Sequence, residues 1–433
     1  MERCLHCLSR VCQRAARTRR ILRVALGCVL MLASADSHGD APPVALQLSG
    51  FVQADVYAFR KDSEDAQDQL DQATGQPLNE ARFLIRRARL RATAEARYLG
   101  GLIELDGSTV QGAQARLLGA EAWVEWRAAG AALPFVQLGM GLFKIPFGRE
   151  VQQYDPERAF LERSHIIQAL FPGEYDLGLR LHGGFRFLRY AMAVMNGAPA
   201  GDVMFALRDP NRSKDVLGRL GIDAALGRAV RIRAGASGLY GSGFSPGSPA
   251  TKDMLSWRDD NEDGLVQPSE ILAIRGRSEV PSQTFSRDAL GADLELIGRV
   301  PHLGELQISG ELIWARNLDR GLVPADPIGA GRTLRELGYY VAVSQQLTPY
   351  AQVGLRYDFY DPDADRQEQL GAQRVPVSAA FASLTVTASA LLGRMGRVSC
   401  EYQNHRNALG RSAAGVPTTL GRDAVLIRAQ VVF

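Results

Sequence analysis

Apolar and polar residues alternate with a period of two over much of this chain. In residues 44–59, for example, Leu46, Leu48 and Val52 fall on one face and Gln53 falls on the other. Successive side chains of a β-strand point to opposite faces, so this pattern predicts strands with one apolar and one polar face. About sixteen such segments can be counted, near 44–59, 82–98, 101–110, 119–128, 133–144, 176–187, 188–196, 215–226, 228–240, 284–299, 303–317, 334–346, 348–360, 374–391, 396–406 and 421–433.

The connections between these segments alternate between short and long. Residues 99–101 and 226–228 are short connections, whereas 145–175 and 241–283 are long ones. A closed barrel in an outer membrane satisfies its backbone hydrogen bonds between strands and has tight turns at one end and long loops at the other. The predicted fold class is therefore all-β: a transmembrane antiparallel β-barrel of about 16 strands, with short periplasmic turns and long external loops. A soluble β-sandwich or β-helix would not explain why every second connection is long.

The first 35 residues form a predicted secretory signal peptide. A basic segment precedes an apolar stretch of about 13 residues, and Ala33, Ser34 and Ala35 are the small residues of a cleavage site. That stretch is short for a transmembrane helix, which needs about 20 residues. Lipid attachment through Cys28 is the alternative, although the apolar run continues past this cysteine. We expect cleavage to leave residues 36–433 as a single barrel.

Cleavage changes the charge of the chain. The full sequence has 50 basic and 47 acidic side chains, of which residues 1–35 hold seven arginines and one glutamate. The remaining 43 basic and 46 acidic side chains give a net charge of −3, so no basic surplus supports nucleic-acid binding. Cys400 is the one cysteine left, which excludes an intrachain disulfide in the mature chain.

Residues 82–98 form a predicted strand with a strongly charged face. Side chains two apart on a strand are separated by about 7 Å along the wall. Arginine stays charged and binds phosphate oxygens through planar donors, so an inward row of arginines predicts a path for anions. Inward carboxylates such as Asp106 and Glu295 would balance these charges, which leaves a general diffusion pore as the alternative. The arginines of the predicted inward face are Arg87, Arg89, Arg91 and Arg97.

Several stretches within residues 82–197 resemble the phosphate-selective porin (O and P) family. The most specific are "GLFKIPFG" at 141–148 and "DLGLRLHG" at 176–183, and the resemblance is detailed over about 115 residues. Members of that family are sixteen-stranded trimeric porins with an arginine-lined, anion-selective pore, so the resemblance implies a homotrimer that passes small anions such as phosphate. The family's phosphate sites also use lysines, of which the mature chain has only four: Lys61, Lys144, Lys214 and Lys252.

The resemblance also implies that residues 145–175 fold into the lumen and narrow it. This loop contains Arg149, Arg158 and Arg163 beside several acidic residues. We expect these three arginines to face the arginine row of the strand across a constriction. A charged, solvated loop is the alternative.

Residues 259–270 match a twelve-residue calcium-binding loop inside the predicted external loop 241–283. No flanking helices are predicted, so bound Ca²⁺ would order the long loop and would not act as a switch. External calcium is abundant, so a dissociation constant of about 10⁻⁴–10⁻³ M would suffice. An acidic loop without a ligand is the alternative. The predicted Ca²⁺ ligands are Asp259, Asn261, Asp263, Leu265, Gln267 and Glu270.

Together these patterns predict a porin of the bacterial outer membrane that lets small anions, with phosphate among them, diffuse through an arginine-lined pore. The expected partners are the lipid bilayer, lipopolysaccharide, small anions and further copies of the same chain. The scattered histidines show no ligand or catalytic spacing, so we predict no enzymatic activity. A surface-binding barrel with a plugged lumen and calcium-ordered loops is the remaining alternative.

Overall fold

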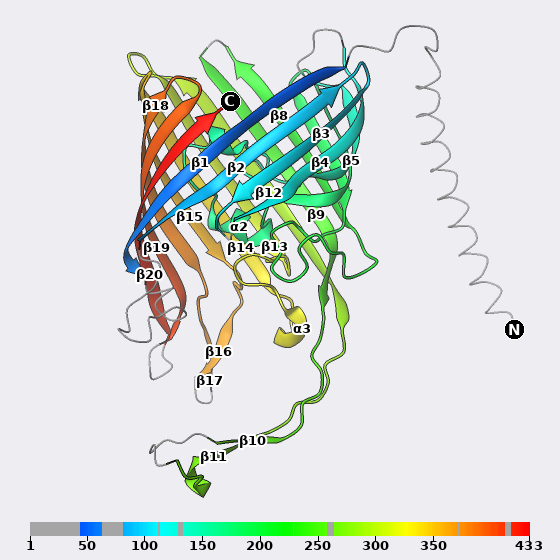
Figure 1. Cartoon of the computed structure of the whole chain (residues 1–433), viewed down its shortest axis with the longest axis vertical. Coiled ribbons are helices and arrows are strands. Elements are labelled where there is room, and N and C mark those ends of the chain that lie inside the picture. Colours follow the sequence, from blue (N-terminus) through cyan, green and yellow to red (C-terminus); the bar gives the residue numbers. More distant parts are fainter. Residues whose placement is uncertain are drawn as a thin grey trace, which may run out of the picture. The chain divides into compact units, whose positions relative to one another are not determined.

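The computed structural model describes residues 44–62, 81–110, 113–128, 133–227, 229–257, 264–370, 373–411 and 417–433. These residues form a closed β-barrel with two small accessory sheets (Figure 1). The predicted signal peptide lies outside the described residues. No helix within the described ranges is long and apolar enough to cross a membrane.

Sixteen of the described strands make up the barrel, each hydrogen-bonded to the next, as the sequence predicts. The first and last strands pair with each other and close it, with Val52 opposite Val431. The backbone N–H of Phe433 donates to the carbonyl of Gly50 at 3.0 Å. The barrel strands are, in order, β1 (Ala45–Asp62), β2 (Ala81–Glu95), β3 (Leu99–Ser108), β4 (Gln114–Trp126), β5 (Val136–Lys144), β6 (Tyr175–Phe185), β7 (Leu188–Met195), β8 (Asp215–Leu226), β9 (Val230–Ser245), β12 (Gln283–Arg299), β13 (Glu305–Arg316), β14 (Arg335–Thr348), β15 (Ala351–Asp361), β18 (Phe381–Leu392), β19 (Gly396–Arg411) and β20 (Pro417–Val432).

Apolar side chains cover the outer face of the barrel and polar side chains line the inner face, as the alternation predicts. On β1, Leu46 and Leu48 are exposed on the outside, whereas Gln53 and Asp55 are buried inside. A continuous hydrogen-bonded ladder with no open edge and an apolar outer surface are the two requirements for a β-barrel that spans a bilayer. The fold is therefore that of a membrane barrel.

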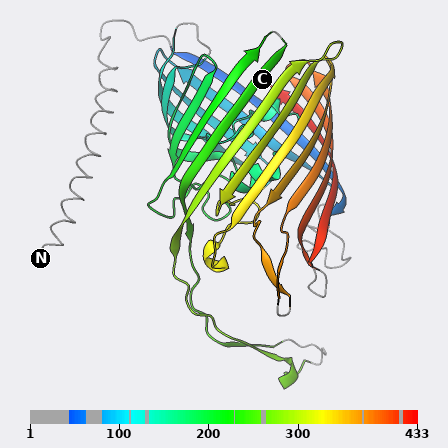
Figure 2. The ribbon, with the colours of Figure 1, turned by 180° about the vertical axis from the view of Figure 1, so that it is seen from behind.

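Long connections leave the end of the barrel opposite to the C-terminus, and short turns such as 186–187 lie at the C-terminal end (Figure 1). Two of the long connections contain hairpins of their own (Figure 2). The segment predicted as a strand from residue 374 enters the barrel only at Phe381, because the residues before it belong to one of these hairpins. The hairpin strands are β10 (Met254–Trp257) with β11 (Ile271–Ile274), and β16 (Gln367–Leu370) with β17 (Gln373–Pro376).

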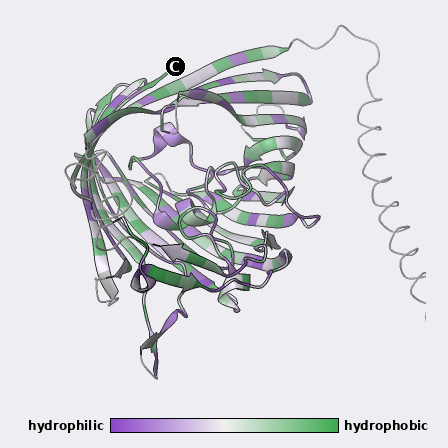
Figure 3. Cartoon of the chain, turned by 60° about the horizontal axis from the view of Figure 1, so that its bottom comes forward, coloured by the Kyte–Doolittle hydropathy of each residue, from purple (hydrophilic) through white to green (hydrophobic). Residues whose placement is uncertain are grey.

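Residues 145–174, called the inner loop below, connect β5 to β6 and fold into the lumen (Figure 3). The inner loop contains a short turn, η2 (Asp155–Glu157), and a short helix, α2 (His165–Leu170). At Gly148 the backbone has a φ of 59°, and a Cβ atom there would lie 1.7 Å from Oε1 of Glu311 on β13. The loop therefore enters the lumen through a position that favours glycine for both its conformation and its space.

One side of the inner loop packs against an apolar part of the barrel wall. Phe147, Ile166 and Ile167 are completely buried, and the ring of Phe147 lies 4.8 Å from that of Phe171. Burial of one such side chain contributes about 1.5–3 kcal/mol, so this contact is a major reason why the loop stays inside. The wall side of the cluster comes from β5, β7, β8, β9, β12, β13 and β15 and consists of Phe143, Ala193, Met195, Leu217, Leu239, Ala289, Ile313, Ala315 and Tyr360.

Candidate functional site in the barrel lumen

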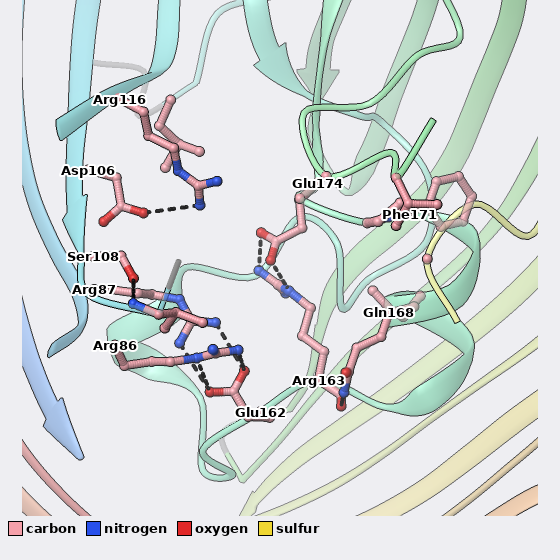
Figure 4. A pocket seen from close by; sticks show the side chains of 18 of the residues that line it. Arg86, Arg87, Asp106, Ser108, Arg116, Glu162, Arg163, Gln168, Phe171 and Glu174 are labelled. Atoms are coloured by element: carbon pink, nitrogen blue, oxygen red, sulfur yellow. Dashed lines mark hydrogen bonds and ion pairs between the residues drawn. The ribbon is translucent and has the colours of Figure 1, made fainter. Parts of the chain in front are cut away.

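A carboxylate of the inner loop lies at the centre of a cluster of arginines from the wall. Arg86 of β2 donates to both carboxylate oxygens of Glu162, through Nε at 2.8 Å and Nη2 at 3.0 Å (Figure 4). Arg87 of β2 and Arg428 of β20 each add a bond, at 3.1 Å and 2.8 Å. Burial alone would raise the pKa of Glu162, but the surrounding guanidinium groups hold this pKa well below its ordinary value. Glu162 is therefore ionised at neutral pH.

Asp155 forms a second centre of the same kind. Its carboxylate accepts a bond from Arg89 of β2 and lies against Arg158 and Arg163 of the inner loop itself. Arg87 also approaches it, at 3.8 Å. Burial alone would raise the pKa of Asp155, but Arg158 first and then the other three arginines hold it well below its ordinary value. Arg158 and Arg163 thus lie close to Arg89 of β2, with the Asp155 carboxylate between them.

The wall also holds the backbone at the tip of the inner loop. Nη1 of Arg428 donates to the carbonyl of Leu161 at 2.6 Å, and Nη1 of Arg356 donates to the carbonyl of Glu162 at 2.7 Å. The N–H of Leu161 donates to Oε2 of Glu401 at 2.9 Å. The backbone on both sides of the Glu162 side chain is therefore fixed by contacts that do not involve its carboxylate.

Three cavities surround the tip of the inner loop. The largest, of about 460 Å³, lies between the loop and β2–β4 and is lined by five arginines and three carboxylates (Figure 4). The second, of about 180 Å³, is bordered by β1, β2, β15 and β18–β20 and is lined by five arginines and two carboxylates. The third, of about 30 Å³, lies toward β13 and β14. Among the described residues, Glu162 alone lines all three cavities.

A fourth cavity, of about 250 Å³, lies near the connection between β4 and β5. Arg180, Arg189 and Arg219 line it, and no described carboxylate side chain does. The partner carboxylates lie behind the lining, since Nη2 of Arg180 is 2.6 Å from Oε2 of Glu121 and Arg219 pairs with Asp293. Arginine therefore also dominates the lining at the end of the barrel that carries the short turns.

Arg87, Arg89 and Arg91 of the row expected on β2 are each paired with a carboxylate. Arg87 and Arg89 are 8% and 7% exposed, and both are paired with carboxylates of the inner loop. The Arg91 side chain is 36% exposed, and its Nη2 lies 2.6 Å from Oε2 of Glu104 on β3. The expected ladder of exposed charges is thus corrected: Arg87 and Arg89 fasten the loop to the wall, and Arg91 forms an ion pair within the wall.

Two of the expected pore arginines lie elsewhere. β2 ends at Glu95, so Arg97 falls in the following turn, where its guanidinium lies 4.8 Å from the ring centroid of Tyr98. Arg149 belongs to the inner loop but pairs with Glu295 on β12, which lies on the wall opposite β2. The position of Arg97 depends on where β2 ends, and the position of Arg149 depends on the path of the inner loop. The alternation of apolar and polar residues predicts neither.

Sequence reasoning missed the arginines and the carboxylate at the centre of the site. The parity of β2 assigns Arg86 to the lipid face with Ala88, yet its side chain reaches Glu162 in the lumen. Arg428 lies on the inward parity of the last strand, which was a usable signal. Nothing in the sequence connects it with a loop residue 266 positions earlier.

A shift in strand pairing explains why Arg86 points inward. Arg89 lies opposite Asp106 on β3, whereas the carbonyl of Ile85 accepts the N–H of Thr109, which is a change of one residue in register. Such a shift is a β-bulge, which redirects the side chains of the bulged strand. Two successive arginines can therefore reach the same carboxylate.

Three of the six predicted calcium ligands lie outside the described residues: Asp259, Asn261 and Asp263. Oε2 of Glu270 accepts from the N–H of Gln267 and from Nε1 of Trp257, both at 3.2 Å, and closes the turn η3 (Pro268–Glu270). Leu265 is exposed. Within the described residues, no group of three or more His, Cys, Asp or Glu side chains could hold a metal ion.

No protein-family model matches the sequence, and no curated protein matches it. The outer-membrane channel DcaP of Acinetobacter baumannii is similar in structure, with a TM-score of 0.56 and 12% identity over 90% of this chain and 97% of that one. An anion-selective porin from Comamonas acidovorans has a TM-score of 0.53 and 12% identity over 90% and 100% of the two chains. OmpT, an outer membrane protein of Vibrio cholerae in its trimer form, has a TM-score of 0.50 and 9% identity over 91% and 100%.

At these identities the likeness establishes the fold. The narrower relationship to phosphate-selective porins has no matching family model and stays a hypothesis based on sequence motifs. The chain itself has a closed sixteen-stranded ladder and an apolar outer face, and its fold is similar to that of solved outer-membrane channels. The chain is therefore a barrel of the bacterial outer membrane with the fold of a porin-like channel.

Proposed function

We propose that this chain is a channel for small anions, whose path follows the polar part of the lumen beside the tip of the inner loop. The observation that carries the proposal is the excess of arginine over carboxylate in the linings of three cavities, two at the tip of the inner loop and one near the connection between β4 and β5. Clefts with low-dielectric walls concentrate the field of such charges and raise the local concentration of ions of opposite sign. Anions are therefore favoured over cations along this path.

Two arginines outside the expected ladder are more exposed to the cavities than Arg87 and Arg89 are. Arg87 and Arg89 are neutralised at close range, whereas the Arg116 side chain is 53% exposed and stands 3.5 Å from Asp106. Arg86 is 28% exposed and borders the two larger cavities. Partly exposed guanidinium groups bind an ion weakly enough to release it, which conduction requires.

Passage of phosphate is a narrower proposal that rests on the sequence motifs. Lys144 is not offered to the lumen, because its Nζ donates to the carbonyl of Gln153 at 2.7 Å and lies 3.5 Å from Glu174. Lys214 pairs with Asp209. We therefore propose general diffusion of small anions, with phosphate among them, over strict phosphate specificity.

The test is planar-bilayer conductance of the refolded mature protein under a potassium chloride gradient, with phosphate added afterwards. We expect the reversal potential to shift toward the equilibrium potential of chloride. Phosphate is expected to block part of the current. A reversal potential at zero or on the potassium side would overturn anion preference and leave a general diffusion porin. A protein that inserts without conducting would favour the surface-binding barrel with a plugged lumen.

Two further proposals concern assembly and calcium. The trimer form of the neighbour from Vibrio cholerae supports a homotrimer, which light scattering of the detergent-solubilised protein would measure. Ca²⁺ binding by the segment 259–270 rests on the spacing of its oxygen ligands. Isothermal titration is expected to give a heat of Ca²⁺ binding, and its absence would remove that proposal.

A further inference from the structure

We propose that Arg86, Arg87 and Arg428 form a binding site for the carboxylate group of a small organic anion. Glu162 is the tethered occupant of this site, and a permeating carboxylate displaces it. Glu162 then sets which anions dwell in the channel and for how long. This inference rests on the proposed channel function and names a substrate class for it.

The geometry of the cluster fits a planar carboxylate. Arg86 offers Nε and Nη2 to the two oxygens of Glu162, at 2.8 and 3.0 Å, which is the parallel two-bond arrangement of a guanidinium and a carboxylate. Arg428 adds a third short bond at 2.8 Å. Because the present occupant is itself a carboxylate, its place fits the same group on a diffusing molecule.

The position of Glu162 makes the site accessible from the lumen cavities. This residue borders the two larger cavities and also the third cavity at β13 and β14, and its carboxylate side chain is 15% exposed. The cavity of about 460 Å³ beside it has room for a small organic anion. An anion in either of the two larger cavities therefore lies next to the Glu162 carboxylate.

Displacement of this carboxylate leaves the rest of the site in place. The backbone of the loop tip is held by Arg356 and by Glu401, independently of the Glu162 carboxylate. Arg428 keeps two bonds of 2.7 Å to Asp55. Arg86 has no other carboxylate partner among the described residues, so it is the arginine that gains most from an incoming anion.

Competition with Glu162 gives the channel a weak site of high specificity. The apparent affinity of a ligand falls by the fraction of time for which its site is vacant. A diffusing carboxylate is therefore recognised by three arginines, yet it is released when the glutamate returns. This combination suits diffusion through a pore, which needs recognition without long residence.

The test compares Glu162→Gln with Glu174→Gln in the full mature chain. Glu174 lies in the same loop, lines the same large cavity and carries the same charge, but it is paired with Arg163 and Lys144. Isothermal titration with malonate, and separately with phosphate, would measure binding in detergent without any need for conduction. We expect Glu162→Gln to bind malonate about tenfold more tightly than the wild type or more, with a smaller gain for phosphate.

A second variant tests whether the gain in malonate affinity depends on Arg86 or only on the loss of a negative charge. Glu162→Gln combined with Arg86→Gln is expected to return malonate affinity to the wild-type level. Arg86→Gln alone, which leaves the carboxylate with two partners, is expected to weaken block of the wild-type current by malonate. These two variants also keep the inference testable where the single glutamine variant folds poorly.

The outcomes separate this inference from the channel function. Equal malonate affinity in Glu162→Gln and Glu174→Gln would overturn the tethered occupant and leave the anion channel standing. A preference for phosphate over malonate in Glu162→Gln would overturn the substrate class. A wild-type barrel that conducts without anion preference, while Glu162→Gln gains malonate binding, would overturn the channel proposal and leave the site in place.

Discussion

The inner loop meets two sides of the barrel wall that differ in chemistry. Toward β7–β13 it presents Phe147 and Phe171, and toward β14 and β15 it presents Ile166; all three are buried in one apolar cluster. Toward β1, β2 and β20 it presents Asp155 and Glu162, which are surrounded by arginines. The cavities of about 460 and 180 Å³ lie on the charged side, whereas the cavity within the apolar cluster has a volume of about 20 Å³.

Both contacts hold the loop, but they differ in how much open space they leave beside it. The apolar contact fills part of the lumen, because tightly packed side chains leave no continuous water-filled space. The charged side chains on the other side pack less densely. Buried charges need partners with good hydrogen-bond geometry, and water molecules can remain beside them. The lumen is therefore narrowed from the apolar side, and the proposed path of anions follows the charged side.

Loss of Asp155 is expected to have the largest effect on the loop. Asp155→Asn would leave four arginines around a neutral amide, and removal of one partner of a buried ion pair costs about 3–5 kcal/mol. The loop tip should then protect its backbone amides less, which hydrogen exchange of peptides from the inner loop would measure. Asp288→Asn is the matched control, since Asp288 forms a partly exposed pair with Arg316 that is worth about 0–1 kcal/mol. Equal effects of the two variants would contradict the anchoring role.

A cavity on the apolar side is expected to have the next largest effect. Phe147→Ala removes a side chain with no exposed surface, and large-to-small changes at such sites cost about 3 kcal/mol or more. We expect larger single-channel conductance with more current fluctuation, because the apolar contact that narrows the lumen is loosened. Phe83→Ala, on the outside and 86% exposed, is the control for loss of an aromatic ring. Unchanged conductance in Phe147→Ala would mean that the apolar contact does not narrow the path.

Lowering the pH should gradually weaken the ionic contacts of Glu162 and Asp155 in the wild-type chain. The folded-state pKa values of Glu162 and Asp155 lie well below their ordinary values of 4.5 and 3.8, so their ionic contacts are fully present above about pH 4.5. The contribution of these contacts to the stability of the loop falls as the pH drops below the ordinary pKa values. It is lost below the folded-state pKa values. Single-channel conductance is therefore expected to stay constant from pH 7 to pH 5 and to fluctuate below about pH 4. A transition near pH 6–7 would contradict this prediction.

Much of the architecture could be predicted from the sequence because it depends on local rules. Alternation with a period of two, and connections that alternate in length, predicted a sixteen-stranded barrel and the outward and inward faces of its strands. Strand ends were less certain, since the hairpin of β16 and β17 has the same alternation as the barrel strand that follows it. Arg97 was misplaced for the same reason, because β2 stops at Glu95 and alternation alone carries no stop signal.

The chemistry of the lumen depended on contacts that alternation does not encode. Arg86 lies on the lipid-facing parity, and only a one-residue shift in pairing brings it inward. Leu217 and Ile313 lie on the inward parity, and their apolar side chains make sense only once the inner loop is seen to cover them. Arg428 and Glu162 are separated by 266 positions and meet through barrel closure.

The sequence by itself determined that this chain forms a closed barrel with an arginine-rich interior, because strand alternation and side-chain charge are properties of single residues and near neighbours. Only the tertiary structure decided which arginines are neutralised, because this depends on where a 30-residue loop lies within the lumen. The ion pairs of Asp155 and Glu162 turn an apparent ladder of charges into an anchor. The electrostatics of the path are therefore set by the fold of the loop, and the barrel that holds it is set by the pattern of the strands.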